Sequence, residues 1–111
     1  MHNPKDYKLL NTDDFSSVFN FRKRLNSPHL FIHYAPNLLN HHRVGFVIGK
    51  KTEKRAVRRN YMRRSMREVL KIILPPSFSF DIVIRVHKTF YRNDFNQMRS
   101  ELEQLIIRLI K

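Results

Sequence analysis

Residues 50–71 combine a dense run of positive charge with the apolar spacing of a helix. They contain ten Lys and Arg residues against two acids, a net +8 of the chain's +13. From residue 55 onward, apolar side chains recur at i, i+4, i+7 and i+11, at Met62, Met66, Val69 and Ile73. Two prolines at 75–76 end this pattern. The segment is therefore predicted to be a helix with one face in a core and the opposite, basic face in solvent.

The flanking sequence predicts short strands and two further helices. Thr12 or Asp13 can cap a first helix, and Asn93 or Asp94 a last one with apolar residues three and four apart. Strands are expected near residues 22–24, 30–35, 43–48 and 80–87. The order α-β-β-β-α-β-α predicts an α+β two-layer sandwich with helices packed on one sheet. The length of 111 residues predicts one domain, residues 1–111.

Composition excludes several classes of protein. The chain has no cysteine, which removes disulfides, thiolate nucleophiles and cysteine zinc sites. Its first eleven residues lack the apolar centre of a signal peptide, and no apolar run approaches the roughly 18 residues of a membrane span. We therefore expect a soluble protein of the cytoplasm.

The excess charge predicts a polyanionic partner. Twenty-two Lys and Arg face nine Asp and Glu, and adjacent like charges destabilise a helix unless an external anion offsets them. A solvated surface is the simpler alternative, but the predominance of Arg favours nucleic acid. Composition leaves RNA and DNA open. The predicted binding residues are Lys50, Lys51, Arg55, Arg58, Arg59, Asn60, Arg63, Arg64, Arg67 and Lys71.

Three aromatic residues, Phe15, Phe19 and Tyr34, are candidates for stacking on unpaired bases beside this basic surface. Ordinary core packing is the alternative for each of them. The sequence does not show which of the two roles applies.

No protein active site or metal site is predicted. His41 and His42 are adjacent, a poor spacing for two ligands of one ion. His33 and His87 could in principle form an acid–base pair for RNA cleavage, but nothing in their spacing demands it. The acidic residues do not form the carboxylate cluster of a two-metal nuclease. We expect no catalytic residue, no metal ligand and no cofactor bound by the protein itself.

One combination of motifs matches a known family. Arg43-x-Gly45 opens a strand that leads to Lys50-Lys51, and a predicted helix then carries Arg59-Asn60, Arg63-Arg64 and Arg67-Glu68. This pattern resembles the bacterial ribonuclease P protein subunit, and the element order matches over roughly residues 10–110. The family's R-N-R signature is incomplete here, because Tyr61 stands where its second Arg is usual. Arg58 could supply the lost charge, and His87 stands where a basic residue is common.

The resemblance implies a mixed sheet with a left-handed β-α-β crossover, a fold shared with a domain of a small-subunit ribosomal protein. It implies a subunit that joins a catalytic RNA and helps remove the 5′ leader of precursor tRNA. The RNA would hold the catalytic Mg²⁺ ions. By the resemblance, Phe15, Phe19 and Tyr34 line a cleft for the leader. The residues that the resemblance places against the catalytic RNA are Lys50, Lys51, Arg59, Asn60, Arg63, Arg64 and Arg67.

Other functions remain open. A general or ribosomal RNA-binding protein with no processing role would carry a similar basic helix. A DNA-binding protein would lay this helix in the major groove, yet no zipper or helix-turn-helix pattern precedes it. A membrane-surface helix is disfavoured because the same apolar face has to cover the sheet. We expect catalytic RNA and precursor tRNA as partners, without DNA or membrane.

Overall fold

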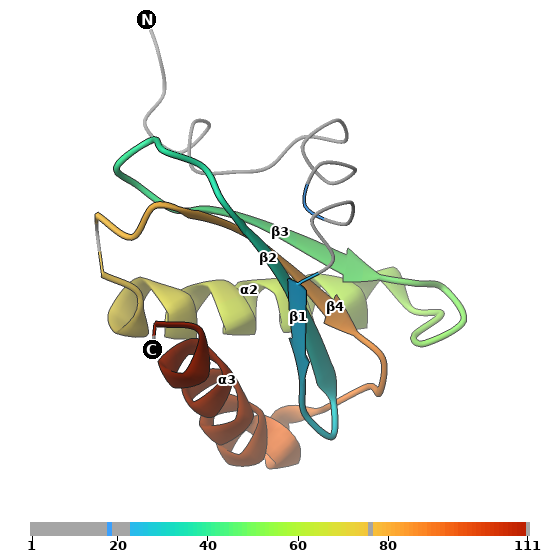
Figure 1. Ribbon diagram of the computed structural model, residues 1–111. Coiled ribbons are helices and arrows are strands. Elements are labelled where there is room, and N and C mark those ends of the chain that lie inside the picture. The colour runs from blue at the N-terminus through green and yellow to red at the C-terminus, as the bar shows by residue number, and fades with distance from the viewer. Residues whose placement is uncertain (1–17, 19–22, 76, 111) are drawn as a thin grey trace, which may run out of the picture.

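The computed structural model describes residue 18 and residues 23–75 and 77–110 (Figure 1). Val18 is helical and buried, and the rest of the predicted first helix lies outside the described residues. The other elements follow the predicted order. They are β1 (Lys23–Asn26), β2 (Leu30–Pro36), β3 (Arg43–Ile48), α2 (Ala56–Ile73), β4 (Phe80–Val86), the short 3₁₀ helix η2 (Arg92–Asp94) and α3 (Phe95–Ile110).

The four strands form one mixed sheet in the order β1-β2-β4-β3. β2 pairs antiparallel with β1 and with β4, whereas β3 runs parallel to β4. Because β3 and β4 are parallel neighbours, α2 connects them as the predicted crossover. β4 is rich in β-branched residues and lies inside the sheet, while β3 forms one edge.

Both helices cover the same face of the sheet, which confirms the α+β two-layer sandwich (Figure 1). The cross-strand pair Ile32 and Ile84 faces this core, and both side chains are fully buried. The side chains that cover them include Met62 and Met66 of α2 and Leu102 of α3. Burial of this apolar surface is the main force that holds the layers together.

Helix α2 has the face predicted for it. Met62, Met66 and Val69 are buried, and Leu70 joins them at the same side. The backbone N–H of Leu74 donates to Leu70 O at 2.9 Å, and the helix stops before the prolines at 75–76. None of the helices in the part of the chain that the structure describes is long and apolar enough to cross a membrane.

Two buried acids tie distant elements together. Glu101 of α3 accepts hydrogen bonds from Ser27 Oγ (2.6 Å), from the backbone N–H of His29 (2.8 Å) and from His29 Nδ1 (2.6 Å). Asp81 of β4 pairs with Arg43 through Nε and Nη2, at 2.8 and 2.7 Å. The first network anchors the β1–β2 turn on α3, and the second fixes the start of β3 beside β4.

Candidate RNA-binding surface

Three arginines of α2 form a row along the side of the helix that borders the sheet edge. Arg59, Arg63 and Arg67 are four residues apart and therefore lie above one another on the helix surface. Arg67 Cζ lies 5.7 Å from the ring centroid of Phe46 in β3. Because β3 is one of the two edge strands of the sheet, this row, here called the β3-side row, follows one edge of the sheet.

Hydrogen bonds orient two members of the β3-side row. Arg59 Nη1 donates to the carbonyl oxygens of Glu53 (2.8 Å) and Lys54 (2.9 Å), and Arg63 Nη1 donates to Asn60 Oδ1 (3.0 Å). Each guanidinium has five N–H donors, so donors remain for a phosphate. A side chain that is already oriented loses less rotamer entropy when it binds.

Arg58 lies on the other flank of α2. Its Cζ is 4.4 Å from the ring centroid of Tyr91, and its Nη1 is 3.9 Å from Glu53 Oε1. Tyr61 is half-buried at the margin between the helix faces, and its ring centroid lies 6.4 Å from that of Phe90. The basic residues of α2 are therefore divided between two flanks, and Arg58 shares its flank with Tyr61.

Glu53 organises the start of α2. Its buried side chain accepts from the backbone N–H of Arg55 and from Thr89 Oγ1, both at 3.1 Å. The bond from the Arg55 N–H, supported by Thr89 and by the charges of Arg58 and Arg55, holds the pKa of Glu53 below its usual value although burial opposes this. Glu53 therefore stays ionised and fixes the base of the basic helix.

The remaining predicted cations are exposed around this helix. Lys50 and Lys51 occupy the turn after β3, where Thr52 N and Glu53 N both donate to Gly49 O at 3.1 Å. Lys71 pairs with Glu68 at 3.3 Å, an exposed contact of little energetic weight. The other exposed positions among the predicted binding residues are Arg55, Asn60, Arg64 and Arg67.

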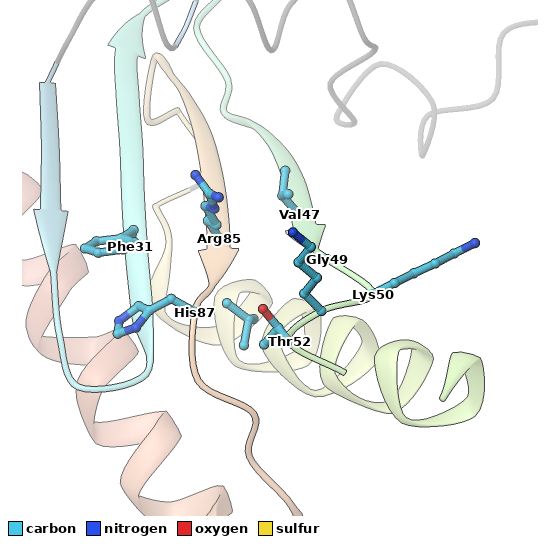
Figure 2. A pocket seen from close by; sticks show the side chains of 9 residues that line it. Phe31, Val47, Gly49, Lys50, Thr52, Arg85 and His87 are labelled. Carbon is cyan, nitrogen blue, oxygen red and sulfur yellow. The ribbon is translucent and has the colours of Figure 1, made fainter. Parts of the chain in front are cut away.

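A groove of about 430 Å³ opens on the face of the sheet opposite α2 and α3 (Figure 2). Phe31, Arg85 and His87 line it from the sheet, and Lys50 and Lys51 line it from the turn. The other described lining residues are Val47, Gly49, Thr52 and Val86, so the described part of the lining contains cations and an aromatic ring but no carboxylate. Arg85 and Phe31 were not among the predicted site residues, although Arg85 interrupts the apolar run from Ile82 to Val86 in β4.

Aromatic and cationic side chains are in contact in this groove. The ring centroids of Phe31 and His87 are 4.3 Å apart. Arg24 Cζ of β1 lies 5.5 Å from the Phe31 centroid. Cations beside aromatic rings suit single-stranded nucleic acid, which exposes both phosphates and base faces.

The predicted leader-cleft residues are placed only in part. Phe15 and Phe19 lie outside the described residues. Tyr34 pairs with Ile82, packs half-buried against the core, and its ring centroid lies 6.0 Å from that of Phe80. It therefore lies on the helix-covered face of the sheet and not on the face that carries the groove.

The neighbouring His33 lies on the groove face. Burial, and then the charges of Arg24 and Arg85, lower the pKa of His33. It does not pair with His87, whose ring instead contacts Phe31 and the Ser27 carbonyl. Within residues 18, 23–75 and 77–110, no three His, Asp or Glu side chains gather as a metal site would require.

Comparisons with known proteins give a consistent result. The family model described as Ribonuclease P matches residues 3–110. The ribonuclease P protein component of Chromobacterium violaceum is 38% identical over 95% of this chain and 87% of its own length. That of Ralstonia pickettii is 39% identical over 92% and 78%, respectively. The solved structure of the Thermotoga maritima RNase P protein superposes with a TM-score of 0.77 at 31% identity, covering 89% of this chain and 94% of that one.

Proposed function

Because the chain belongs to the ribonuclease P protein family, we propose that it joins a catalytic RNA and assists the removal of the 5′ leader from precursor tRNA. Membership makes the chain a component of an endoribonuclease complex. In this proposal the RNA performs the cleavage, and the protein contributes binding and position. No side chain of the protein acts as a catalytic residue.

The observation that carries this proposal is the continuity of the cationic surface. Lys50 and Lys51 line the groove and also lead into the base of α2, where Arg59 begins the β3-side row. One polyanion can therefore contact the helix while a second, adjacent strand occupies the groove. The two RNA molecules would repel each other without the cations between them.

The two parts of this surface suit different RNA structures. The β3-side row is a line of guanidinium groups, two of which are oriented by hydrogen bonds, and this suits the phosphates of a folded catalytic RNA. The groove offers Phe31 and His87 rings beside cations, which suits an unpaired leader. We retain Phe15 and Phe19 as proposed leader contacts, whereas the position of Tyr34 against Phe80 favours a packing role.

The proposal assigns the Mg²⁺ ions of the complex to the RNA. The protein side chains named here neutralise phosphate charge and bring RNA and substrate together, which strengthens metal binding indirectly. We propose the cytoplasm as the site of this activity.

The test compares precursor tRNA that carries a 5′ leader with mature tRNA, in the presence and absence of the matching catalytic RNA. We expect tighter binding and faster cleavage of the leader-bearing form only when protein and catalytic RNA are combined. Purified protein freed of RNA is the control and should not cleave either tRNA. Cleavage by the protein alone would contradict the assignment of chemistry to the RNA.

A general or ribosomal RNA-binding protein is the alternative that the same experiment separates. Such a protein would bind precursor and mature tRNA equally and would leave cleavage by the catalytic RNA unchanged. That outcome would refute the processing role while leaving RNA binding in place.

A further inference from the structure

His87 is held in the groove by two contacts. It follows the last residue of β4, and its Nε2 lies 2.9 Å from the Ser27 carbonyl oxygen. Its ring also lies against Phe31, with the two ring planes 31° apart (Figure 2). These contacts fix the orientation of the imidazole although the residue itself is exposed.

The contact with Ser27 determines where the His87 ring carries its protons. A carbonyl oxygen only accepts hydrogen bonds, so Nε2 carries a proton whether the ring is neutral or charged. The neutral ring therefore has a bare Nδ1, and protonation converts Nδ1 into a second donor. Among the described residues, Nδ1 has no hydrogen-bond partner of its own.

The described side chains that line the groove around His87 are cationic or neutral. The nearby acid is Glu101 of α3, which lies behind the β1–β2 turn and is bound there by Ser27 and His29. Arg85 of β4 and Lys50 and Lys51 of the turn line the same groove, and Lys88 follows in the chain. Phe31 of β2 covers the ring, and Arg24 of β1 lies over Phe31. Among the residues that the structure describes, the groove lining contains no carboxylate to offset them. These cations attract an RNA phosphate into the groove, and a phosphate bound beside the ring favours the imidazolium.

We propose that His87 takes up a proton from solvent at Nδ1 when an RNA phosphate enters the groove. The new Nδ1–H then donates to a phosphate oxygen, and the proton returns to solvent when the RNA leaves. This inference rests on the proposed function, because it assumes that the groove receives the single-stranded leader. It makes leader binding depend on pH through one identified side chain.

The expected change in the Kd for RNA between low and high pH follows from proton linkage. The ordinary pKa of histidine is about 6.5, and a rise of about one unit on binding makes the Kd roughly five- to tenfold weaker at pH 8.5 than at pH 6. The chain has no cysteine, so its other groups that titrate in this range are the remaining five histidines and the terminal amine. Variants of His87 therefore separate the contribution of His87 to the pH dependence of RNA binding from the contributions of the other groups.

The experiment measures the Kd of a fluorescent single-stranded RNA of leader sequence between pH 6 and 8.5 at constant ionic strength. We expect His87→Lys to bind tightly across this range and His87→Gln to bind weakly across it, both with little pH dependence. His41→Gln, in the β2–β3 loop, is the matched histidine control and should keep the wild-type profile. The NMR titration of the His87 ring should show a higher pKa with RNA than without it.

Two outcomes separate this inference from the function on which it rests. If His87→Lys and His87→Gln keep the wild-type pH dependence while the complex still prefers leader-bearing tRNA, proton uptake at His87 is refuted and the proposed function stands. If the complex shows no such preference but the pH dependence disappears in both variants, the processing role is refuted and proton uptake on binding RNA is supported.

Discussion

Replacing Glu101 by Ala tests how the protein positions its groove. The carboxylate is only 9% exposed and accepts three hydrogen bonds from the β1–β2 turn, one from Ser27 and two from His29. The same turn offers the Ser27 carbonyl to His87. Glu101 therefore helps to position His87, a lining residue of the groove, through the backbone of Ser27.

The cost of this change follows from the burial of the network. Removing one partner of a buried, hydrogen-bonded pair destabilises a protein by about 3–5 kcal/mol, because the remaining polar groups lose their partner in a poorly solvated place. For a domain of this size that corresponds to a fall in Tm of at least ~12 °C. This loss of free energy is a large part of the roughly 5–15 kcal/mol by which small domains are stable.

The stabilisation by Glu101 also depends on pH. Burial opposes its ionisation, but the hydrogen bonds from Ser27 and His29 outweigh burial and hold the pKa of Glu101 below its usual value. A lowered carboxyl pKa stabilises the fold above the unfolded pKa of about 4.3, and this stabilisation is lost as pH falls through the folded value. The difference in free energy of unfolding between wild type and Glu101→Ala should therefore be constant near neutral pH and should become smaller in acid.

Urea unfolding of the full chain measures these differences. Glu103→Ala is the matched control, because Glu103 lies on the same helix and its partner among the described residues is the exposed Arg99, at 2.9 Å. Loss of that i,i+4 pair should cost no more than about 0.5 kcal/mol. A Glu101→Ala protein within 1 kcal/mol of wild type would refute the reasoning about the buried network.

Three further outcomes are expected. Arg67→Ala should reduce the slope of log Kd for the catalytic RNA against log salt concentration by about 0.7–0.9, the share of one phosphate contact. Arg108→Ala, exposed near the end of α3, should leave that slope unchanged, and equal effects of the two would contradict a specific role for Arg67. Asp81→Ala should lower the free energy of unfolding, measured in urea, by about 3–5 kcal/mol, because Arg43 loses a bidentate partner and Asn37 loses an acceptor. A loss below 1 kcal/mol would contradict a stabilising role of the Arg43–Asp81 pair. Sulfate should raise the Tm above that in chloride of equal ionic strength, because the +13 chain repels itself without bound anions, and an unchanged Tm would contradict this.

Several elements were predictable because their signals are local. The spacing of Met62, Met66 and Val69 specifies the buried face of α2, and the following prolines specify its end. The β-branched run at Ile82, Val83 and Ile84 specifies β4. Each signal lies within one segment and depends on backbone geometry and hydrophobicity alone.

The two faces of the sheet were not assignable in the same way. Alternation along β2 places Phe31 and His33 on one face and Tyr34 on the other. Which face the helices cover depends on where α2 and α3 pack, and no local pattern contains that information. The sequence therefore left both base stacking and core packing open for Tyr34, and only the tertiary structure places its ring beside Phe80.

By itself, the sequence determined that this chain has a basic amphipathic helix, strands that pack against this helix, and a net positive charge that predicts a polyanionic partner. Only the tertiary structure decided which cations act together. Arg58 and Arg59 are adjacent in sequence, but about 100° of rotation per residue directs them to Tyr91 and to the carbonyls before α2, respectively. Phe31 and His87 come together because β2 and β4 are neighbours in the sheet, and that pairing arises from contacts between segments far apart in the chain.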